Sequence, residues 1–423
     1  MYEDIIAKLN AEDISVRLNA AREVGELIRG GKLPVTPVGE DVNNHIHTTY
    51  SFSPYSPTMA VYKSIEAGLW TAGIMDHDSI SGAREFVEAA RLMGINATVG
   101  IECRADMSGT VLKGRRFNNP DQIDVAYSAL HAVPHSGIDE VTAFFAPRIE
   151  LRNTRNRLMV ERINAIIDID LDFDRDVLPL SDYARGGSVT ERHLLYAVAT
   201  KLIAKVGKEN VLATLDSMGI KVSDKIRGYL SDMDNPCFSY DLLGVLKSDM
   251  VERFYIPATD ELPTVTEVAE LARRVGAIYA YAYLGDVGNS VTGDKKAQRF
   301  EDEYLDELFA SLKALGFNAV TYMPSRNTDE QIARLQTLCK KHGLMEISGE
   351  DINTPRQQFV CVKQRAPQFE HLKASAFALI GSENAEKYGD VPMFDPSNTN
   401  RFEDMDEMIA HYEALGKKGG YNV

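Results

Sequence analysis

The sequence has few cysteines and no excess of basic residues, and both shortages narrow the possible functions. Its four cysteines stand far apart along 423 residues and form no Cys-x-x-Cys pair. This spacing argues against a zinc ribbon or a disulfide framework and is typical of a protein from a reducing cytosol. The net charge is −16 at pH 7. A general nucleic-acid binder needs a basic surface, so this class is disfavoured, although a local basic pocket for one phosphorylated molecule is compatible with the charge.

Long apolar runs are also missing. No segment approaches the roughly 20 apolar residues that a membrane-spanning helix needs. The N-terminal stretch MYEDIIAKLNAEDIS is acidic and lacks the basic-then-apolar order of a signal peptide. We therefore expect a cytoplasmic protein with no membrane partner. The length allows one large α/β domain with extensions, or two or three ordinary domains.

Two regions of alternating strand and helix patterns are separated by a mostly helical stretch. The alternation predicts a parallel sheet or barrel, and the helical stretch between its halves is interpreted as an insertion. Residues 4–30 predict one helix, which Gly30 and Gly31 end. The expected parts are an N-terminal helical extension, a first barrel part, the helical insertion, a second barrel part and a C-terminal extension, at residues 1–40, 41–135, 136–262, 263–355 and 356–423.

Histidines and carboxylates follow several of the predicted strands. The stretch NNHIHTTYSFSP places His45 and His47 two residues apart, so on a strand both imidazoles point to the same side. A metal ion is the commonest reason for this arrangement, and two solvated loop histidines are the alternative. α/β barrels place their active sites at the carboxyl ends of the strands. Further candidates at strand ends or in strand-like stretches are Asp76, His77, Asp78, Glu102, His131, His193 and Asp351.

Imidazole nitrogens and carboxylate oxygens are the ligands of Zn²⁺, Mn²⁺ and Fe²⁺, and one carboxylate can bridge two ions. A lone histidine such as His131 or His193 is more often structural than metal-binding. The whole set of histidines and carboxylates, in this order along the chain, is a more specific sign of metal binding than any single residue. It predicts a metal centre at the mouth of a barrel.

These motifs, in this order, resemble the PHP (polymerase and histidinol phosphatase) superfamily of metal-dependent phosphoesterases. The resemblance covers roughly residues 41–355 and implies a distorted (β/α)7 TIM-like barrel of the branch with a helical insertion. It implies hydrolysis of a phosphomonoester of a small metabolite or nucleotide by a metal-activated hydroxide. The matching motifs are HIHTTYS, IMDHDSISG, GIEC, the histidine of LHAVPHSGID, RNRLMVERINAI, VTERHLLYAVA and ISGEDIN.

The resemblance also implies a binuclear centre of Zn, Mn or Fe ions. Glu102 would bridge the two ions. The other ligands of the first ion would be His45, His47 and Asp351, and those of the second ion His131 and His193.

Many members hold a third ion, for which His77 would be one ligand here. Phe52 and Asn353 occupy the other two positions. Phenylalanine cannot ligate and an asparagine oxygen is a poor ligand for these metals, so we expect the third site to be weak or empty. His77 would then be free to act as a general acid.

Several further residues are candidates for catalysis and substrate binding. Asp76 or His77 would move a proton or orient a ligand. Arg192 is the first candidate to hold a phosphate oxygen and Arg104 the second, because a guanidinium can bind phosphate in a bidentate manner; a surface ion pair is the alternative for either. Tyr283 stands where members have a substrate-facing histidine and could hydrogen-bond a phosphate. Residues 285–296 are Gly-rich but lack the ending of a phosphate loop, and are interpreted as a loop over the barrel mouth or an ordinary connection.

Two other functions stay open at this point. One is a phosphodiesterase or exonuclease on short oligonucleotides, which the acidic charge disfavours. The other is a degenerate, non-catalytic protein that keeps a metal for structure. The departures from the family pattern at Phe52, Tyr283 and Asn353 favour this alternative. The presence of every ligand of a two-metal centre argues against it. The sequence does not predict the oligomeric state.

Overall fold

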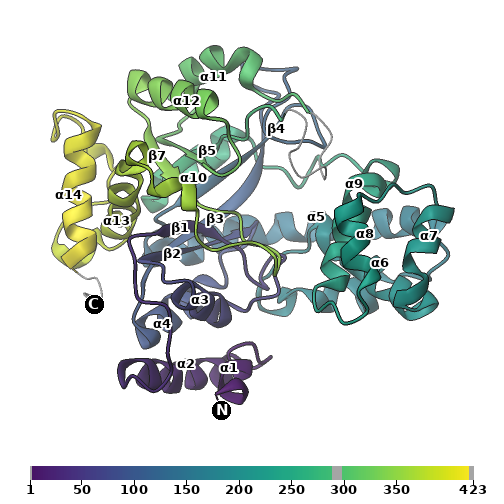
Figure 1. Ribbon diagram of the computed structural model, residues 1–423. Coiled ribbons are helices and arrows are strands. Elements are labelled where there is room, and N and C mark those ends of the chain that lie inside the picture. The colour runs from purple at the N-terminus through teal and green to yellow at the C-terminus, as the bar shows by residue number, and fades with distance from the viewer. Residues whose placement is uncertain (1, 288–297, 419–423) are drawn as a thin grey trace.

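The computed structural model describes residues 2–287 and 298–418. Most of the Gly-rich segment 285–296 therefore lies outside the described residues. Seven strands form one nearly closed, barrel-shaped sheet, which confirms the fold class predicted from the sequence (Figure 1). In the order of the sheet these are β1 (Val42–Ile46), β2 (Thr71–His77), β3 (Asn96–Asp106), β4 (Val125–His131), β5 (Ile278–Ala282), β6 (Ala319–Tyr322) and β7 (Met345–Ser348).

The strands run parallel except β4, which is antiparallel to both β3 and β5. The carboxyl end of β4 therefore lies beside the first residue of β5 on one side and beside the middle of β3 on the other. The two outer strands meet through Ile352, just beyond β7. The amide of His47 donates to the Ile352 carbonyl over 2.9 Å, and the Ile352 amide donates to the His45 carbonyl over 3.1 Å. Barrel closure thus involves the backbone of both predicted metal-binding histidines.

Amphipathic helices cover the outside of the barrel. Their starts follow capping rules: Thr264 and Thr328 each form a capping box with the side chain three residues later. None of the described helices is both long and apolar enough to cross a bilayer. The covering helices are α3 (Pro57–Glu66), α4 (Ala83–Met93), α10 (Val265–Val275), α11 (Leu305–Leu312) and α12 (Asp329–His342).

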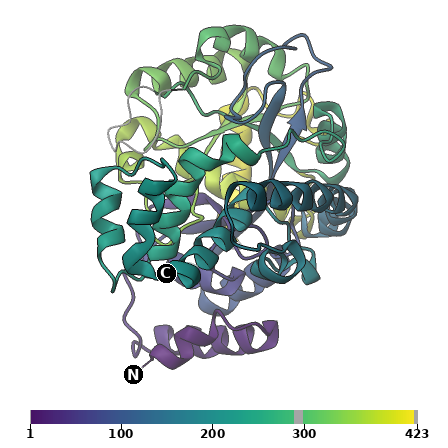
Figure 2. The same cartoon turned by 90° about the vertical axis from the view of Figure 1, so that its right-hand side faces the viewer.

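A helical region between β4 and β5 lies over the carboxyl ends of the parallel strands, on the right in Figure 1 and facing the viewer in Figure 2. It has an apolar core of its own, to which the barrel contributes Phe52. The loop after β1 touches it directly, since Ser188 donates its amide to the Tyr50 carbonyl over 2.7 Å. The boundaries drawn from the sequence stay a prediction. The helices are α5 (Ile138–Ile166), α6 (Glu191–Val206), α7 (Val211–Ser217), α8 (Asp224–Ser231) and α9 (Phe238–Phe254).

The C-terminal helices α13 (His371–Glu383) and α14 (Met405–Lys418) close the opposite end of the barrel. Ala378 and Leu379 of α13 pack with Ile278 and Met345, the first residues of β5 and β7. The apolar floor of the barrel therefore lies beneath α13, and the open end faces the insertion.

The N-terminal extension forms two helices, α1 (Glu3–Lys8) and α2 (Ile14–Arg29), rather than the single helix expected over residues 4–30. The Asp13 side chain accepts hydrogen bonds from the amides of Ser15 and Val16, so it caps a new helix and interrupts the pattern.

A buried ion pair fixes this extension to the barrel. Arg17 of α2 donates from Nη2 to Oε2 of Glu85 on α4 over 2.5 Å and from Nε to Oε1 over 2.8 Å. The two side chains are only 3% and 4% exposed. Thr58 adds a hydroxyl donor to the same carboxylate over 2.7 Å. Removing the guanidinium would leave a buried, poorly compensated charge.

We therefore predict that Arg17→Met lowers the free energy of unfolding by about 3–5 kcal/mol, the usual cost of breaking a buried pair. Chemical denaturation of the full chain measures this loss. The matched control is Arg84→Met, whose exposed pair with Asp139 should contribute about 1 kcal/mol or less. Equal losses in the two variants would contradict the structural role of the buried pair.

Candidate metal centre

Three strands bring histidines and carboxylates together at the open end of the barrel. His45 lies in β1 and His47 directly follows it, so strand alternation points both imidazoles to the same side. Glu102 lies in β3, and the β2–β3 register sets it opposite His77. Asp351 follows β7 by three residues and reaches the cluster because Ile352 pairs with β1.

The distances within this group suit one cation. Nε2 of His45 and Nε2 of His47 are 3.2 Å apart. Oε2 of Glu102 lies 3.6 Å and 3.8 Å from these two nitrogens, and Oδ1 of Asp351 lies 3.1 Å from that of His47. A tetrahedral zinc ion with Zn–N distances of about 2.0–2.1 Å would separate two nitrogens by about 3.3 Å. His45, His47 and Glu102 form the only group of three potential ligands within 4.8 Å of one another among the described residues.

The electrostatics favour the ligand forms of Glu102, Asp351 and His47. Burial lowers the pKa of His45, but the charges of Glu102 and Asp351 together raise it above its usual value. Burial opposes ionisation of Glu102, but the charges of His77 and His45 hold the pKa of its carboxyl well below the usual value. Burial also opposes ionisation of Asp351, and the hydrogen bond and charge of His47 lower its pKa well below the usual value. Burial and the charge of His77 lower the pKa of His47. Two carboxylates and a neutral imidazole are the species that bind divalent metals.

A second layer of hydrogen bonds orients His47. Its Nδ1 lies 3.3 Å from Oγ of Ser51, which donates to Asp76 over 2.6 Å. Asp76 also accepts from the amide and the hydroxyl of Thr48, each over 2.6 Å. The buried Asp76 therefore fixes the loop after β1 and, through Ser51, the ring of His47. The sequence predicted Asp76 but gave no signal for Ser51 or Thr48.

His77 lies on the other side of Glu102. Its Nδ1 is 2.9 Å from Oε2 of Glu102, and its ring stacks on His47 with 4.5 Å between centroids. Its side chain is 20% exposed, so the ring borders the open end of the barrel. Tyr127 of β4, which the sequence analysis missed, lies next to it with 5.9 Å between ring centroids. Within the described chain the Tyr127 hydroxyl has no hydrogen-bond partner, so it is available to a ligand.

His131, predicted as a ligand of a second ion, is not part of the group. It ends the antiparallel β4, where it pairs with Ile278 of β5 and follows Leu130, which pairs with Ile101 next to Glu102, so its role as a ligand of a second ion stays a prediction. Burial and the charge of His45 lower the pKa of the His131 imidazole to about 3, so it is neutral. Its Nε2 is buried and has no hydrogen-bond partner among the described residues.

His193, the other predicted ligand of a second ion, lies in the first turn of α6 and is not part of the group either. Its Nδ1 accepts a hydrogen bond from the amide of Thr190 over 2.9 Å and so caps the helix. Its ring lies edge-on to Phe52 with 5.0 Å between centroids. Its Nε2 is buried and has no hydrogen-bond partner among the described residues, so its role as a ligand of a second ion stays a prediction.

The two positions expected to weaken a third site differ in their surroundings. Phe52 is part of the apolar core of the insertion. Asn353 uses its side-chain amide to donate to Oδ1 of Asp351 over 2.6 Å, and its own Oδ1 is buried with no hydrogen-bond partner among the described residues. The weak or empty third site stays a prediction.

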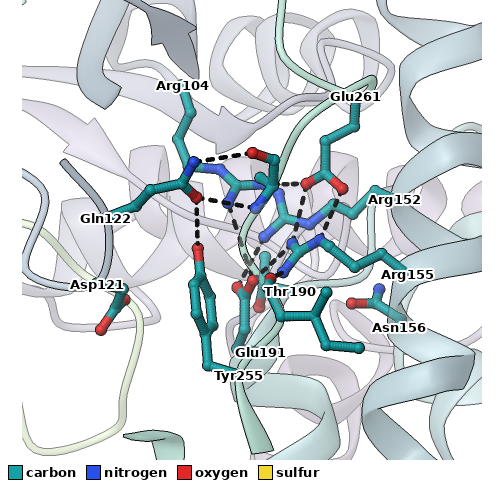
Figure 3. A network of polar contacts seen from close by, with 12 residues as sticks. Arg104, Asp121, Gln122, Arg152, Arg155, Asn156, Thr190, Glu191, Tyr255 and Glu261 are labelled. Atoms are coloured by element: carbon teal, nitrogen blue, oxygen red, sulfur yellow. Dashed lines mark hydrogen bonds and ion pairs between the residues drawn. The ribbon is translucent and has the colours of Figure 1, made fainter. Parts of the chain in front are cut away.

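Arg104 is not free to hold a phosphate, in contrast to the prediction. It pairs with Glu261 inside a buried network between the barrel and the insertion (Figure 3). Arg155 bonds Glu261 over 2.7 Å and Glu191 over 2.8 Å, and Arg152 bonds Glu191 over 2.9 Å. The positive charges are therefore matched by carboxylates. The sequence cannot show this network because its members are up to 157 residues apart.

Arg192, in contrast, makes no hydrogen bond or ion pair with any described residue. Burial raises the pKa of Asp351, and the charge of Arg192 lowers it after the larger effects of His47 and His45, so Arg192 lies within electrostatic range of this carboxylate. Arg326, in the loop after β6, also lies near Asp351 and donates only from Nε to the Leu284 carbonyl over 3.3 Å. The sequence gave no signal for Arg326.

Tyr283 is not available to a substrate, in contrast to the prediction. It is 2% exposed within the apolar core around the barrel. Its hydroxyl donates to Oδ1 of Asp302 over 2.6 Å. Its position after β5 suggested a site residue, but the side chain packs among the covering helices.

The geometry predicts different outcomes for two histidine substitutions. His47→Gln should lower the affinity for Zn²⁺ or Mn²⁺ by more than about 100-fold, because loss of a ligand should exceed the 10–100-fold cost of losing an outer-layer partner. His131→Gln should leave the metal-to-protein ratio unchanged. Titration against a chromogenic chelator measures both. A lower ratio in the His131 variant would show that this imidazole is a ligand.

Comparisons with known proteins agree with the fold and with the motifs. Residues 43–169 match the family model of the PHP domain. No curated protein among those compared matches the chain. A structure from Bifidobacterium adolescentis, described as a "putative metal-dependent phosphoesterase", is 20% identical with a TM-score of 0.50 and covers 75% of this chain and 89% of its own. An amidohydrolase from Chromobacterium violaceum, with bound SO4 and no metal, is 16% identical with a TM-score of 0.51 and covers 76% of this chain and 90% of its own.

At these identities the two structures show the fold alone. The family match includes His45, His47, His77 and Glu102 but ends before Asp351. The resemblance inferred from the motifs is therefore confirmed: residues 43–169 of this chain form part of a PHP domain.

Proposed function

We propose that this protein is a metal-dependent phosphoesterase that hydrolyses a phosphomonoester of a small metabolite or nucleotide. The observation that carries the proposal is the buried group of His45, His47 and Glu102 with Asp351 at its edge, and with Arg192 nearby, which pairs with no described residue. The PHP match and the structural neighbour described as a phosphoesterase support the same class.

The four side chains would hold one divalent ion of the Zn, Mn or Fe type. A bound ion would lower the pKa of a water ligand toward neutrality and neutralise charge on a phosphoryl oxygen. Asp351 is the most exposed of these side chains, at 33% against 1% for His47. Substrate would therefore approach from the side of Asp351, where Arg192 and Arg326 also lie.

Arg192 would bind the phosphate. A guanidinium offers two parallel donors to phosphate oxygens, and this one has no competing carboxylate among the described residues. Arg326 would assist from the loop after β6, since only its Nε is engaged within the described chain. Together the two residues supply a local positive charge in a protein whose net charge is −16.

His77 would carry the proton that the departing alcohol needs. Its Nδ1 contacts Glu102, which leaves Nε2 toward the open end of the barrel. An imidazole whose other nitrogen is held by a carboxylate is a common general acid. Tyr127, next to His77, would contact the same part of the substrate.

Phosphate release from a panel of phosphorylated metabolites and nucleotides tests the proposal directly. We expect turnover of at least one monoester after addition of Mn²⁺, Zn²⁺ or Fe²⁺ to chelator-treated protein, and loss of turnover in Asp351→Asn. Cleavage of short oligonucleotides alone would replace the proposal with a phosphodiesterase. Bound metal without turnover of any substrate would indicate a binding protein.

Arg192→Ala should lower kcat/KM for a monoester substrate by about tenfold or more, because one charge-assisted contact with phosphate is lost. Most of the change should appear in KM, while the metal-to-protein ratio stays the same. The matched control is Arg227→Ala, which removes a surface pair with Asp216 in the insertion and should leave both constants unchanged. An unchanged KM in the Arg192 variant would exclude this residue from phosphate binding.

A further inference from the structure

Asp351 is the one member of the metal group whose position depends on a loop. His45 and Glu102 lie within strands and His47 directly follows one, whereas β7 ends at Ser348. The chain then passes so close to His45 that a Cβ on Gly349 would lie 2.7 Å from the His45 backbone nitrogen. Gly349 and the pairing of Ile352 with β1 hold the backbone on either side of Asp351, so the orientation of its side chain rests on the segment that follows it.

This segment, residues 351–357, is a compact turn. The side chain of Asn353 donates to Asp351 over 2.6 Å. Oε1 of Gln357 accepts from the amides of Asn353 and Thr354, each over 2.7 Å. These bonds tie the metal-binding carboxylate to residue 357, so the turn moves as one unit.

Arg356 anchors the turn to the helical insertion. It donates from Nε to Oδ1 of Asp241 over 2.6 Å and from Nη2 to Oδ2 over 2.7 Å. Asn235 accepts a further bond from Nη2 over 3.1 Å, and the guanidinium lies 3.9 Å from the ring centroid of Tyr229. The Asp241 side chain is only 4% exposed, and Asn235 donates to it over 2.8 Å. A bidentate pair to a buried carboxylate has one preferred geometry.

From these contacts we propose that Arg356 and Asp241 position Asp351, so that the helical insertion takes part in metal binding. The inference rests on the metal centre of the proposed function. Both are positioning residues: they act through the turn at 351–357 and touch no ligand of the metal. The effect follows from the chain of contacts Asp241, Arg356, Gln357, Asn353 and Asp351.

A second attachment keeps the insertion docked when this pair is broken. Arg152 of α5 pairs with Asp78, in the loop after β2, and bonds Glu191 over 2.9 Å. The network in Figure 3 reinforces this attachment, since Arg104 of β3 bonds Glu261. Loss of the Arg356–Asp241 pair is therefore expected to free the turn without detaching the insertion.

The test is the affinity for Zn²⁺ and for Mn²⁺, measured by chelator competition on the full chain, with circular dichroism and thermal unfolding to verify folding. Asp241→Asn and Arg356→Ala should each weaken metal binding by about 10-fold. Loss of a residue that orients a metal ligand without binding the metal itself usually costs about 10–100-fold in affinity. The double variant should be no weaker than the worse single variant, because both changes break one pair. Arg356→Lys should lie between wild type and Arg356→Ala, because lysine keeps the charge but not the bidentate geometry.

The matched control is Asp216→Asn, which breaks the exposed pair with Arg227 in the same insertion and should leave the affinity unchanged. Folded variants of Arg356 and Asp241 with wild-type metal affinity would overturn the inference and leave the proposed function standing. Weaker metal binding without any phosphatase activity in the wild type would support the inference and remove the proposed function. A wild-type protein that binds neither metal would overturn both.

Discussion

Two imidazole nitrogens face each other across 3.2 Å inside the barrel, with two carboxylates beside them, and the architecture depends on this contact. At most one proton fits between Nε2 of His45 and Nε2 of His47, so the group is rich in lone pairs and negative charge. Burial makes such a group costly unless a cation neutralises it. A divalent ion with about 2 Å bonds would be held by His45, His47 and Glu102, with Asp351 beside His47.

The fold supplies most of this contact with backbone hydrogen bonds, and only the Asp351 side chain depends on a loop. Strand alternation in β1 orients the two imidazoles, and the β2–β3 register sets Glu102 beside His77. Closure of the barrel through Ile352 then brings Asp351 to His47. The insertion covers this end of the barrel, and α13 closes the other with an apolar floor. The result is a polar site with one open side, near an arginine that has no partner in the part of the chain that the structure describes, which suits an anionic small molecule.

Much of the fold and part of the site could be predicted from the sequence, because the signals are local. The alternation of strands and helices predicts the barrel, and the His-x-His spacing on a strand predicts a shared direction for His45 and His47. Glu102 and Asp351 were found because they follow or lie in apolar strand patterns.

Other residues were missed or misplaced because their roles depend on strand direction or distant partners. Period-two alternation shows which face His131 occupies but not that β4 runs antiparallel. The burial of Arg104 against Glu261 joins positions far apart in the chain.

X-ray diffraction at the metal absorption edge, from crystals grown with Mn²⁺ or Zn²⁺, tests the central claim most directly. The account predicts an anomalous peak between Nε2 of His45, Nε2 of His47 and the carboxylates of Glu102 and Asp351. No peak at the His45–His47 pair, even with a fully occupied peak near His131 and His193, would contradict it.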